Sequence, residues 1–436
     1  MTVDIVSRPG AVDVTRGERA LVVGVDRLGQ AEGRSSEARL EEAVGLAQAI
    51  GLAVVAQRTF RLRAPRPATL VGKGQADEIA GMAREHEAGL LVVDAALTPV
   101  QQKSLEEQVG TKVIDRTGLI LEIFGERAAT SEGRLQVELA HLDYQAGRLV
   151  RSWTHLERQR GGFGFLGGPG ETQIEADRRL IRDRMARIRR ELEQVKRTRS
   201  LHRGRRQRAP WPVIALVGYT NAGKSTLFNH LTGGEVLAED MLFATLDPTM
   251  RDVKLPGFDK AILSDTVGFV SDLPTQLVAA FRATLEEVAS ADLLVHVRDM
   301  AHPDRDAQRD DVENVLGQLG VGPDDEGAPP RIEAWNKVDL LPADEREALG
   351  AEAARREDVV PISALTGFGI DALRDCISHK LHSGAQLHSI SVPAADGGKI
   401  AWLHSRGTVV EQETRDSHVH LQVRLSPENW ARFQSL

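Results

Sequence analysis

Apolar and polar positions alternate along the chain in a way that predicts two α/β units. Apolar runs of strand length are followed by stretches with helical spacing in residues 1–118 and again in residues 209–384. This order is typical of doubly wound, mostly parallel sheets. We expect strands at 21–25, 54–59, 90–94, 112–115, 213–217, 251–255, 261–265, 293–298, 331–335 and 359–362, and helices at 36–50, 76–86, 99–108, 275–288, 309–319 and 369–381, with one more starting at 224.

Between these units, residues 119–208 have the spacing of a helical hairpin. Apolar side chains recur at 4-3-4-3 intervals in two stretches, which predicts two antiparallel helices sealed along an apolar seam. Two helices that pack separately on a neighbouring domain would give the same spacing. A basic linker at 203–210 ends this segment, and residues 385–436 predict a small C-terminal α+β extension with strands at 399–404, 407–414 and 418–425. The seam residues are Leu135, Leu139, Leu142, Ala146 and Leu149, then Ile181, Met185, Ile188, Leu192 and Val195.

The loop that joins the two predicted helices is rich in glycine. Residues 161–170 include six glycines together with Phe163 and Phe165. Glycine lets a backbone approach a partner closely, and phenyl rings can stack on nucleic-acid bases. Alone, the loop would be read as a flexible linker. At the end of a basic hairpin, it predicts contact with nucleic acid.

Charge is distributed unevenly, which changes the meaning of the overall charge of −8. Residues 148–208 contain 18 Lys and Arg against 7 Asp and Glu, an excess of +11, so the remaining residues carry −19. This asymmetry predicts a polyanionic partner, whereas a charge run alone more often marks a solvated helix.

Composition excludes several classes of protein. Hydrophobic residues make up 41% of the chain, which is enough for folded cores. The single cysteine, Cys376, excludes a disulfide framework and a multi-cysteine metal site. No apolar run approaches the ~18 residues of a membrane-spanning helix, and we expect no signal peptide. These features predict a cytoplasmic protein.

Residues 218–225, GYTNAGKS, fit the P-loop pattern between a predicted strand and a predicted helix. In such a loop the backbone N–H groups surround phosphates. We expect Lys224 to reach the β/γ oxygens and the hydroxyl of Ser225 to ligate Mg²⁺. The motif therefore predicts a nucleoside triphosphate site.

Two further motifs predict guanine and a phosphate-sensing segment. The carboxylate of Asp339, in NKVD at 336–339, can accept from both guanine N1–H and N2–H₂, which adenine does not offer. In DTVG at 265–268, we expect Asp265 to hold Mg²⁺ through water and the N–H of Gly268 to meet the γ-phosphate. Thr245, upstream, is the expected second hydroxyl ligand of Mg²⁺, with Thr249 and Thr226 as alternatives.

The residue after this motif departs from Ras-like proteins, where a glutamine orients the attacking water. This chain has Phe269 there, and a phenyl ring cannot hydrogen-bond water. We therefore expect slow intrinsic GTP hydrolysis that needs a partner.

Several of these motifs together resemble the HflX family of translation-associated GTPases. The resemblance covers most of the chain and rests on GYTNAGKST (218–226), FATLDPT (243–249), DTVGF (265–269) and NKVD. GGPGETQIEADRR (167–179), LVGKGQADEI (70–79) and RTGLILEIFGERA (116–128) are similar to family features.

The resemblance implies a P-loop GTPase domain of the Ras-like class with a separate N-terminal α/β domain and a helical subdomain. It also implies a monomer that binds the large ribosomal subunit and its rRNA, and that splits or rescues stalled 70S ribosomes in its GTP state. Hydrolysis, stimulated by the ribosome, would release it. Two alternatives stay open: a large-subunit assembly or RNA-remodelling GTPase, and a regulatory GTPase that associates transiently with the membrane.

The expected site residues fall into four groups. The nucleotide-binding group is Gly218, Tyr219, Thr220, Asn221, Ala222, Gly223, Lys224, Ser225, Thr226, Phe243, Ala244, Thr245, Leu246, Asp247, Asp265, Thr266, Val267, Gly268, Asn336, Lys337, Val338, Asp339, Ser363, Ala364 and Leu365. The Mg²⁺ group is Ser225, Thr245 and Asp265, and the catalytic group is Lys224, Thr245 and Gly268. The expected rRNA contacts are Arg151, Arg158, Arg160, Gly162, Phe163, Phe165, Arg178, Arg182 and Arg189.

Overall fold

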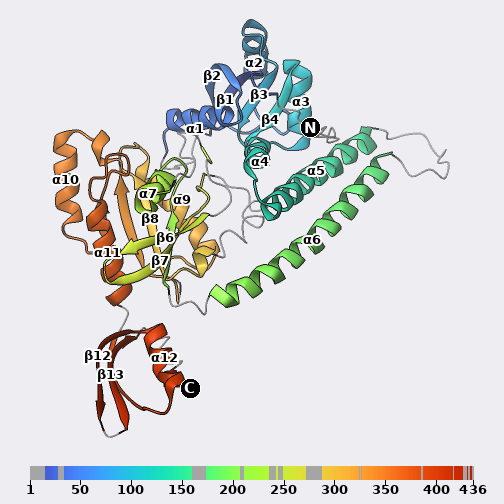
Figure 1. Cartoon of the computed structure of the whole chain (residues 1–436). Helices are drawn as coiled ribbons and strands as arrows, with labels where there is room; N and C mark the ends of the chain where they lie inside the picture. Colours follow the sequence, from blue (N-terminus) through green and yellow to red (C-terminus); the bar gives the residue numbers. More distant parts are fainter. Residues whose placement is uncertain are drawn as a thin grey trace.

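The computed structural model of the chain has three β-sheets and a projecting pair of long helices (Figure 1). Within the residues that it describes, no helix combines the length and the apolar composition needed to cross a bilayer. The described residues are 15–27, 34–159, 173–206, 211–234, 242–243, 249–271, 287–323, 325, 327–383, 386–415, 417–425, 430 and 433–434.

The N-terminal unit is a four-stranded parallel sheet in the order β2-β1-β3-β4. Alternate residues of its central strands face opposite ways: Val22 and Val92 pack with α1 and α4, whereas Leu21 and Leu91 pack with α2 and α3. The sheet is therefore covered on both faces, as the apolar runs predict. Its elements are β1 (Arg19–Arg27), α1 (Ser36–Ala49), β2 (Ala53–Leu62), α2 (Lys73–Glu85), β3 (Leu90–Asp94), α3 (Pro99–Val109), β4 (Lys112–Asp115) and α4 (Arg116–Arg127).

Helix α4 joins this unit, although the sequence-based boundary at residue 118 falls inside it. Asp115 caps the helix by accepting a hydrogen bond from the N–H of Gly118 at 2.8 Å. Leu119 and Phe124 are fully buried in the same core as α1. We propose that the N-terminal domain extends to the end of α4.

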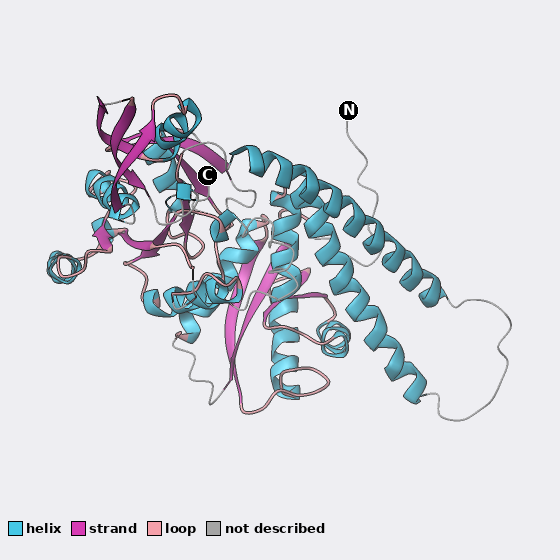
Figure 2. Ribbon diagram, turned by 90° about the horizontal axis from the view of Figure 1, so that it is seen from below, coloured by secondary structure: helices cyan, strands magenta, loops and turns pink. Residues whose placement is uncertain are grey.

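Helices α5 (Ser131–Gln159) and α6 (Gln173–Arg206) run side by side in opposite directions, as both Figure 1 and Figure 2 show. Met185, Ile188 and Leu192 of the predicted seam are buried. Arg184 of α6 donates to both carboxylate oxygens of Glu138 of α5, at 2.7 and 3.0 Å. The predicted hairpin is confirmed, and α6 continues to Arg206, into the segment expected to be a linker.

The third unit is a six-stranded sheet in the order β10-β9-β8-β5-β7-β6. Only the edge strand β6 is antiparallel to its neighbour, so the other five strands end at one edge. The helix expected at 275–288 lies mostly outside the described residues. The elements are β5 (Val213–Val217), α7 (Lys224–Thr232), β6 (Thr249–Leu255), β7 (Phe258–Asp265), β8 (Leu293–Asp299), α9 (Arg305–Gln318), β9 (Arg331–Asn336), the 3₁₀ turn η1 (Val338–Leu340), α10 (Ala343–Ala353), β10 (Val359–Pro361) and α11 (Ile370–Ser383).

The C-terminal unit is a small antiparallel sheet with one helix across it: β11 (Gln386–Pro393), α12 (Gly397–Arg406), β12 (Thr408–Arg415) and β13 (His418–Leu425). The prediction of a strand at 399–404 is wrong, because this segment lies in α12. Asp396 caps the helix by accepting from the N–H of Lys399 at 3.2 Å, and Leu403 is buried against the sheet. The predicted fold class, α/β with a helical hairpin and a small extension, is confirmed as a whole.

Candidate nucleotide site

Four motifs predicted to bind nucleotide meet at one edge of the six-stranded sheet. The P-loop follows β5, Asp265 ends β7, Asn336 ends β9, and Ser363 comes shortly after β10. Because these strands are parallel, their carboxyl ends lie together at the edge where doubly wound sheets bind ligands. The topology thus places segments far apart in the sequence around one site.

The P-loop backbone needs glycine at two positions. Gly218 and Gly223 have φ values of +152° and +92°. A Cβ on Gly218 would lie 2.3 Å from the carbonyl oxygen of Val297, and one on Gly223 would lie 2.3 Å from Nδ2 of Asn336. The loop therefore turns tightly against β8 and β9 and delivers the chain to the first turn of α7, whose N–H groups have no acceptor within the helix.

Lys224 is buried at the start of α7. Its Nζ donates to the carbonyl oxygens of Gly218 and Tyr219 at 3.1 and 2.8 Å, which folds the side chain over the loop. Burial lowers the pKa of this ammonium group to about 8, against the opposing effect of the Asp265 carboxylate. A buried cation at this position is suited to an anionic ligand.

A hydroxyl group and a carboxylate stand side by side beneath the loop. The Ser225 Oγ donates to Oδ2 of Asp265 at 2.8 Å, and Asp265 is fully buried. Thr266 next to it is also buried, with its hydroxyl donating to the Leu216 carbonyl at 2.5 Å. Of the expected metal ligands, Ser225 and Asp265 are thus brought together. Thr245 lies outside the described residues, as do Ala244, Leu246 and Asp247.

The segment after Asp265 is joined to the P-loop through its backbone. Thr220 N–H donates to the Phe269 carbonyl at 2.7 Å, and Phe269 N–H donates to the Gly218 carbonyl at 3.2 Å. A Cβ on Gly268 would lie 2.8 Å from Cγ2 of Thr220 and 3.1 Å from Nζ of Lys224. Gly268 therefore rests directly on the loop. Phe269 is buried in the core that continues into the N-terminal domain.

On the other side of the P-loop, Asn336 connects three segments. Its Nδ2 donates to the Ala222 carbonyl at 2.7 Å, and its Oδ1 accepts from the N–H of Ala364 at 2.9 Å. The adjacent Lys337 pairs with Asp299 at 2.7 Å, a partner that the sequence did not suggest. This network fixes the NKVD turn relative to the P-loop.

The remaining base-side residues differ in exposure. Val338 is buried, whereas Asp339 in η1 is half-buried. Ser363 is buried and accepts from the N–H of Thr366 at 3.1 Å, and Leu365 is exposed. The structure therefore brings the two predicted base-side segments, 336–339 and 363–365, to one place.

Most of the residues expected to contact rRNA lie outside what the structure describes. Arg160, Gly162, Phe163 and Phe165 belong to that segment, and the side chains of Arg151 and Arg158 are also not described. Of the rest, Arg182 and Arg189 are exposed on α6, with Arg178 half-buried on the same helix. Their spacing of four and seven residues puts them on one face.

The P-loop also has neighbours that sequence reasoning missed. The hydroxyl of Tyr219 contacts Arg34 and Glu42 of the N-terminal domain. No local motif marks Glu42, since the partners are 177 residues apart in the chain.

Four family models match consecutive parts of the chain. They are described as the GTP-binding GTPase N-terminal (37–125), the GTP-binding GTPase middle region (127–206), the 50S ribosome-binding GTPase (213–336) and the HflX C-terminal domain (348–434). Together they account for most of the residues.

Curated relatives are similar over nearly the full length. GTPase HflX of Magnetococcus marinus is 49% identical over 395 residues, 91% of this chain and 90% of the relative. GTPase HflX of Escherichia coli is 42% identical over 396 residues, 90% of this chain and 91% of the relative. A solved GTP-binding protein from Sulfolobus solfataricus, in complex with GDP, is 24% identical with a TM-score of 0.45, covering 84% of this chain and 99% of that one.

Proposed function

This chain belongs to the HflX family of GTPases, and on that premise we propose that it binds the large ribosomal subunit and, in its GTP state, splits or rescues stalled 70S ribosomes. Hydrolysis of GTP to GDP and phosphate then releases the protein. The proposal that the chain binds GTP rests on one observation: the P-loop, Asp265 and Asn336 lie together at one edge of the sheet.

The nucleotide chemistry follows from the residues at that edge. Lys224 binds the β- and γ-phosphate oxygens as a buried cation, and the N–H groups at the start of α7 supplement its charge. Asp339 reads the guanine edge from the NKVD turn that Asn336 holds. Gly268 N–H meets the γ-phosphate.

Mg²⁺ is the metal ion that suits the oxygen atoms beneath the P-loop. Half-buried Ser225 and fully buried Asp265 supply a hydroxyl and a carboxylate 2.8 Å apart, and these hard oxygens match the ligand preference of Mg²⁺. Thr245 would add a second hydroxyl group. Held by Ser225 and Asp265, such an ion would supply positive charge against the negative charge that develops on the phosphate groups.

Slow hydrolysis without the ribosome follows from Phe269. Its ring is buried and has no group that can orient water. A partner must therefore supply or reposition the group that does so. We propose that the ribosome does this.

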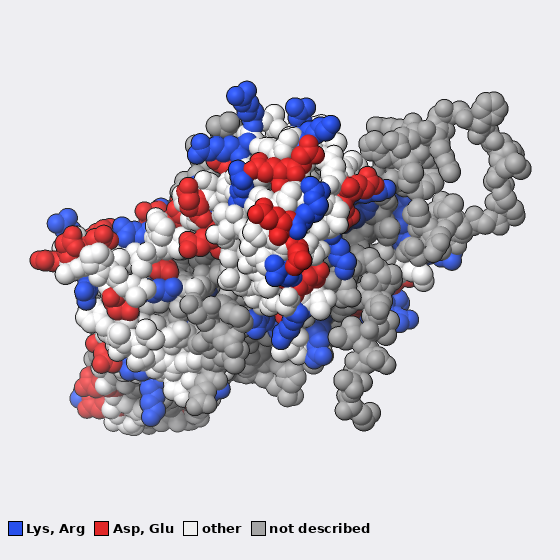
Figure 3. All heavy atoms as spheres, turned by 90° about the horizontal axis from the view of Figure 1, so that it is seen from above, with Lys and Arg blue, Asp and Glu red and all other residues white. Residues whose placement is uncertain are grey.

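The basic face of α6 supports an RNA partner. Figure 3 shows acidic and basic side chains mixed over the face of the N-terminal domain that this view presents. Arg182 and Arg189 are exposed on one helix face, where they can contact phosphates. The family model over 213–336 is itself described as a 50S ribosome-binding GTPase.

The test is to incubate the protein with purified 70S ribosomes and to separate the particles on sucrose gradients. We expect conversion to subunits with GTP or a non-hydrolysable analogue, and none with GDP. If the protein bound only immature large subunits, an assembly function would replace the splitting proposal. Splitting that did not depend on the nucleotide would also contradict it.

A double variant tests the role of α6. Arg182→Gln with Arg189→Gln should weaken binding to the large subunit. The slope of log affinity against log salt concentration should become shallower by about 2, because two phosphate contacts are lost. Arg346→Gln with Arg355→Gln removes the same charge from exposed positions of the third unit and should leave binding unchanged.

A further inference from the structure

The P-loop contains a buried hydroxyl group that makes no hydrogen bond within the described part of the chain. Thr220 is 5% exposed, and its Oγ1 is buried without a donor or acceptor among the described residues. Removing a hydroxyl group from water without such a partner is unfavourable, and most buried polar side chains have one. The position of this group beside a proposed phosphate site therefore calls for a functional explanation.

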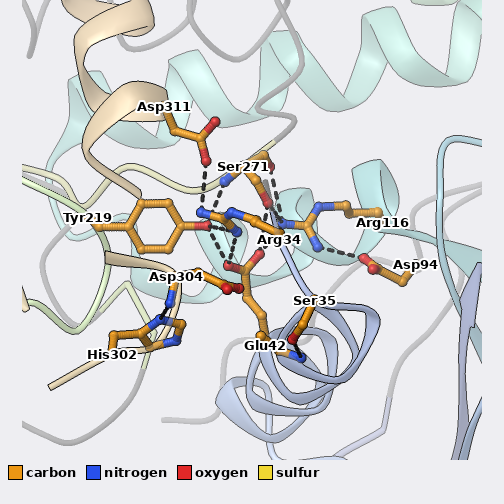
Figure 4. Close-up of polar contacts among 11 residues, drawn as sticks. Arg34, Ser35, Glu42, Asp94, Arg116, Tyr219, Ser271, His302, Asp304 and Asp311 are labelled. Atoms are coloured by element: carbon orange, nitrogen blue, oxygen red, sulfur yellow. Dashed lines mark hydrogen bonds and ion pairs between the residues drawn. The ribbon is translucent and has the colours of Figure 1, made fainter. Parts of the chain in front are cut away.

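The preceding residue, Tyr219, shows the contrast. Its hydroxyl accepts from the N–H of Ser271 at 2.8 Å and from the guanidinium group of Arg34 at 2.9 Å. Figure 4 shows the ring of Tyr219 directed at these two residues. Because Tyr219 forms a β-bridge with Phe269, successive side chains of this extended segment point to opposite sides. The side chain of Thr220 therefore points to the other side of the P-loop.

On that side, Thr220 lies beside two groups that we propose for the γ-phosphate. A Cβ on Gly268 would lie only 2.8 Å from Cγ2 of Thr220, and the same Cβ would lie 3.1 Å from Nζ of Lys224. The side chain of Thr220, the ammonium group of Lys224 and Gly268 thus meet at one place. A γ-phosphate held by Lys224 and by the N–H of Gly268 would border Thr220.

The backbone N–H of Thr220 is already engaged. It donates to the Phe269 carbonyl at 2.7 Å, while the N–H of Phe269 donates to the Gly218 carbonyl at 3.2 Å. These two bonds fix Thr220 against the segment that follows Asp265 and leave its N–H unavailable to a phosphate. The hydroxyl group is the donor that this residue still has to offer.

A single change of side-chain rotamer brings the hydroxyl group to the phosphate position. The methyl group, Cγ2, is the atom of Thr220 that faces Gly268 in this structure. Threonine carries Oγ1 and Cγ2 on the same Cβ, so a step of about 120° in χ1 puts the hydroxyl group where the methyl group now lies. No hydrogen bond within the described residues is broken by this step, because Oγ1 makes none there.

We propose that the hydroxyl group of Thr220 donates a hydrogen bond to an oxygen atom of the γ-phosphate, which makes Thr220 a further catalytic residue for GTP hydrolysis. The attacking water forms a bond from its oxygen to the γ-phosphorus. The bond from that phosphorus to the bridging oxygen breaks, and GDP keeps this oxygen with the electron pair. Both protons of the water leave with the phosphate. The hydroxyl group keeps its own proton and stabilises negative charge on the phosphate oxygens.

This role is distinct from that of the glutamine that Phe269 replaces. A donor to a phosphate oxygen stabilises charge, whereas the glutamine of Ras-like proteins orients the attacking water. Thr220 therefore does not remove the need for a partner, and hydrolysis stays slow without one. The proposal rests on the proposed nucleotide site, since GDP has no γ-phosphate to accept the bond.

The test compares Thr220→Val with Thr220→Ser in the full chain with Mg²⁺. Valine keeps the branched shape and removes the hydroxyl group, whereas serine keeps the hydroxyl group. In the valine variant, affinity for a non-hydrolysable GTP analogue relative to GDP should fall about 10- to 150-fold, as expected for one hydrogen bond to a charged group. The kcat/KM for GTP should fall by a similar factor. The serine variant should stay close to the unmodified protein in both measurements.

Thr111→Val is the matched control. It makes the same substitution at another buried hydroxyl group without a hydrogen-bond partner among the described residues, in the turn between α3 and β4. It should leave the ratio of the two affinities unchanged. Urea unfolding without nucleotide should give the same midpoint for Thr220→Val as for the unmodified protein, because no hydrogen bond within the described residues is lost.

Thr220→Ala, compared with the serine variant, replaces the valine variant if that one fails to fold. An unchanged affinity ratio on loss of the hydroxyl group overturns the proposal. An equal fall in the serine variant also overturns it, because shape and not the hydroxyl group would then be responsible. If the unmodified protein bound neither GDP nor the analogue, the nucleotide site itself would be wrong.

Discussion

Replacing Asn336 by alanine tests whether this residue stabilises the contact between the P-loop and the segment at Ala364, which we call its bracing role, or whether it selects the base. Asn336 is 3% exposed and satisfies the Ala222 carbonyl and the Ala364 N–H. The alanine variant leaves both groups buried without this partner, and each such loss costs about 1–3 kcal/mol. We therefore expect the free energy of unfolding to fall by about 2–6 kcal/mol. GDP and GTP should both bind more weakly, by a similar factor.

The assay combines urea unfolding with titration of a fluorescent GDP. Asp339→Asn is the matched comparison, because Asp339 is half-buried and is expected to contact only the base. It should change the unfolding free energy by less than about 0.5 kcal/mol and shift preference from guanine to xanthine nucleotides. If Asn336→Ala kept its stability and lost only guanine selectivity, the bracing role would be refuted.

Two further predictions concern pH. Burial lowers the pKa of Lys224 to about 8, and bound phosphates would raise it again. GTP affinity should therefore be constant below pH 7 and fall about tenfold between pH 7 and 9. An affinity that stayed constant over that range in a fluorescence titration would contradict the assignment of Lys224 to the phosphate site. Burial also lowers the pKa of His296, on β8, from 6.5 to about 3. The neutral imidazole therefore contributes fully to the free energy of unfolding above pH 6.5, and this contribution is lost as the pH falls towards 3. Urea unfolding should show a loss of about 2 kcal/mol between pH 7.5 and 5, and His296→Gln should lack that part of the loss.

The sequence was informative wherever the signal was local. Apolar runs located the strands of both large sheets to within a few residues, and the P-loop, DTVG and NKVD motifs each begin where a strand ends. Parallel topology then brings these motifs together without further information. The α6 side of the hairpin seam was equally readable, because Met185, Ile188 and Leu192 are buried on one helical face. The predicted α5 side was less accurate, since Leu139 and Leu142 are only half-buried, whereas Val137 and Ala140 are buried.

The elements and contacts that were predicted wrongly, or not at all, lie in segments whose local sequence patterns conflict or carry little information. The run KIAWLH suggests a strand by its alternation, but the Asp396 cap and the packing of Leu403 make it helical. The strand β11 and the helix α10 were not predicted at all, since neither has a strong periodic pattern. The contacts of Arg34 and Glu42 with the third unit could not be predicted, because they join residues as far as 277 positions apart.

The base side of the nucleotide site and its phosphate side are stabilised by contacts with different parts of the chain. Variants on the two sides should therefore have different effects. Asn336 ties the base side to the P-loop within one domain, so its loss should weaken both nucleotides alike. The phosphate side is contacted from the N-terminal domain, where Arg116 donates to Ser271 and Phe124 packs on Phe243. Variants on the base side therefore act within the third unit, whereas variants on the phosphate side also act on its contact with the N-terminal domain.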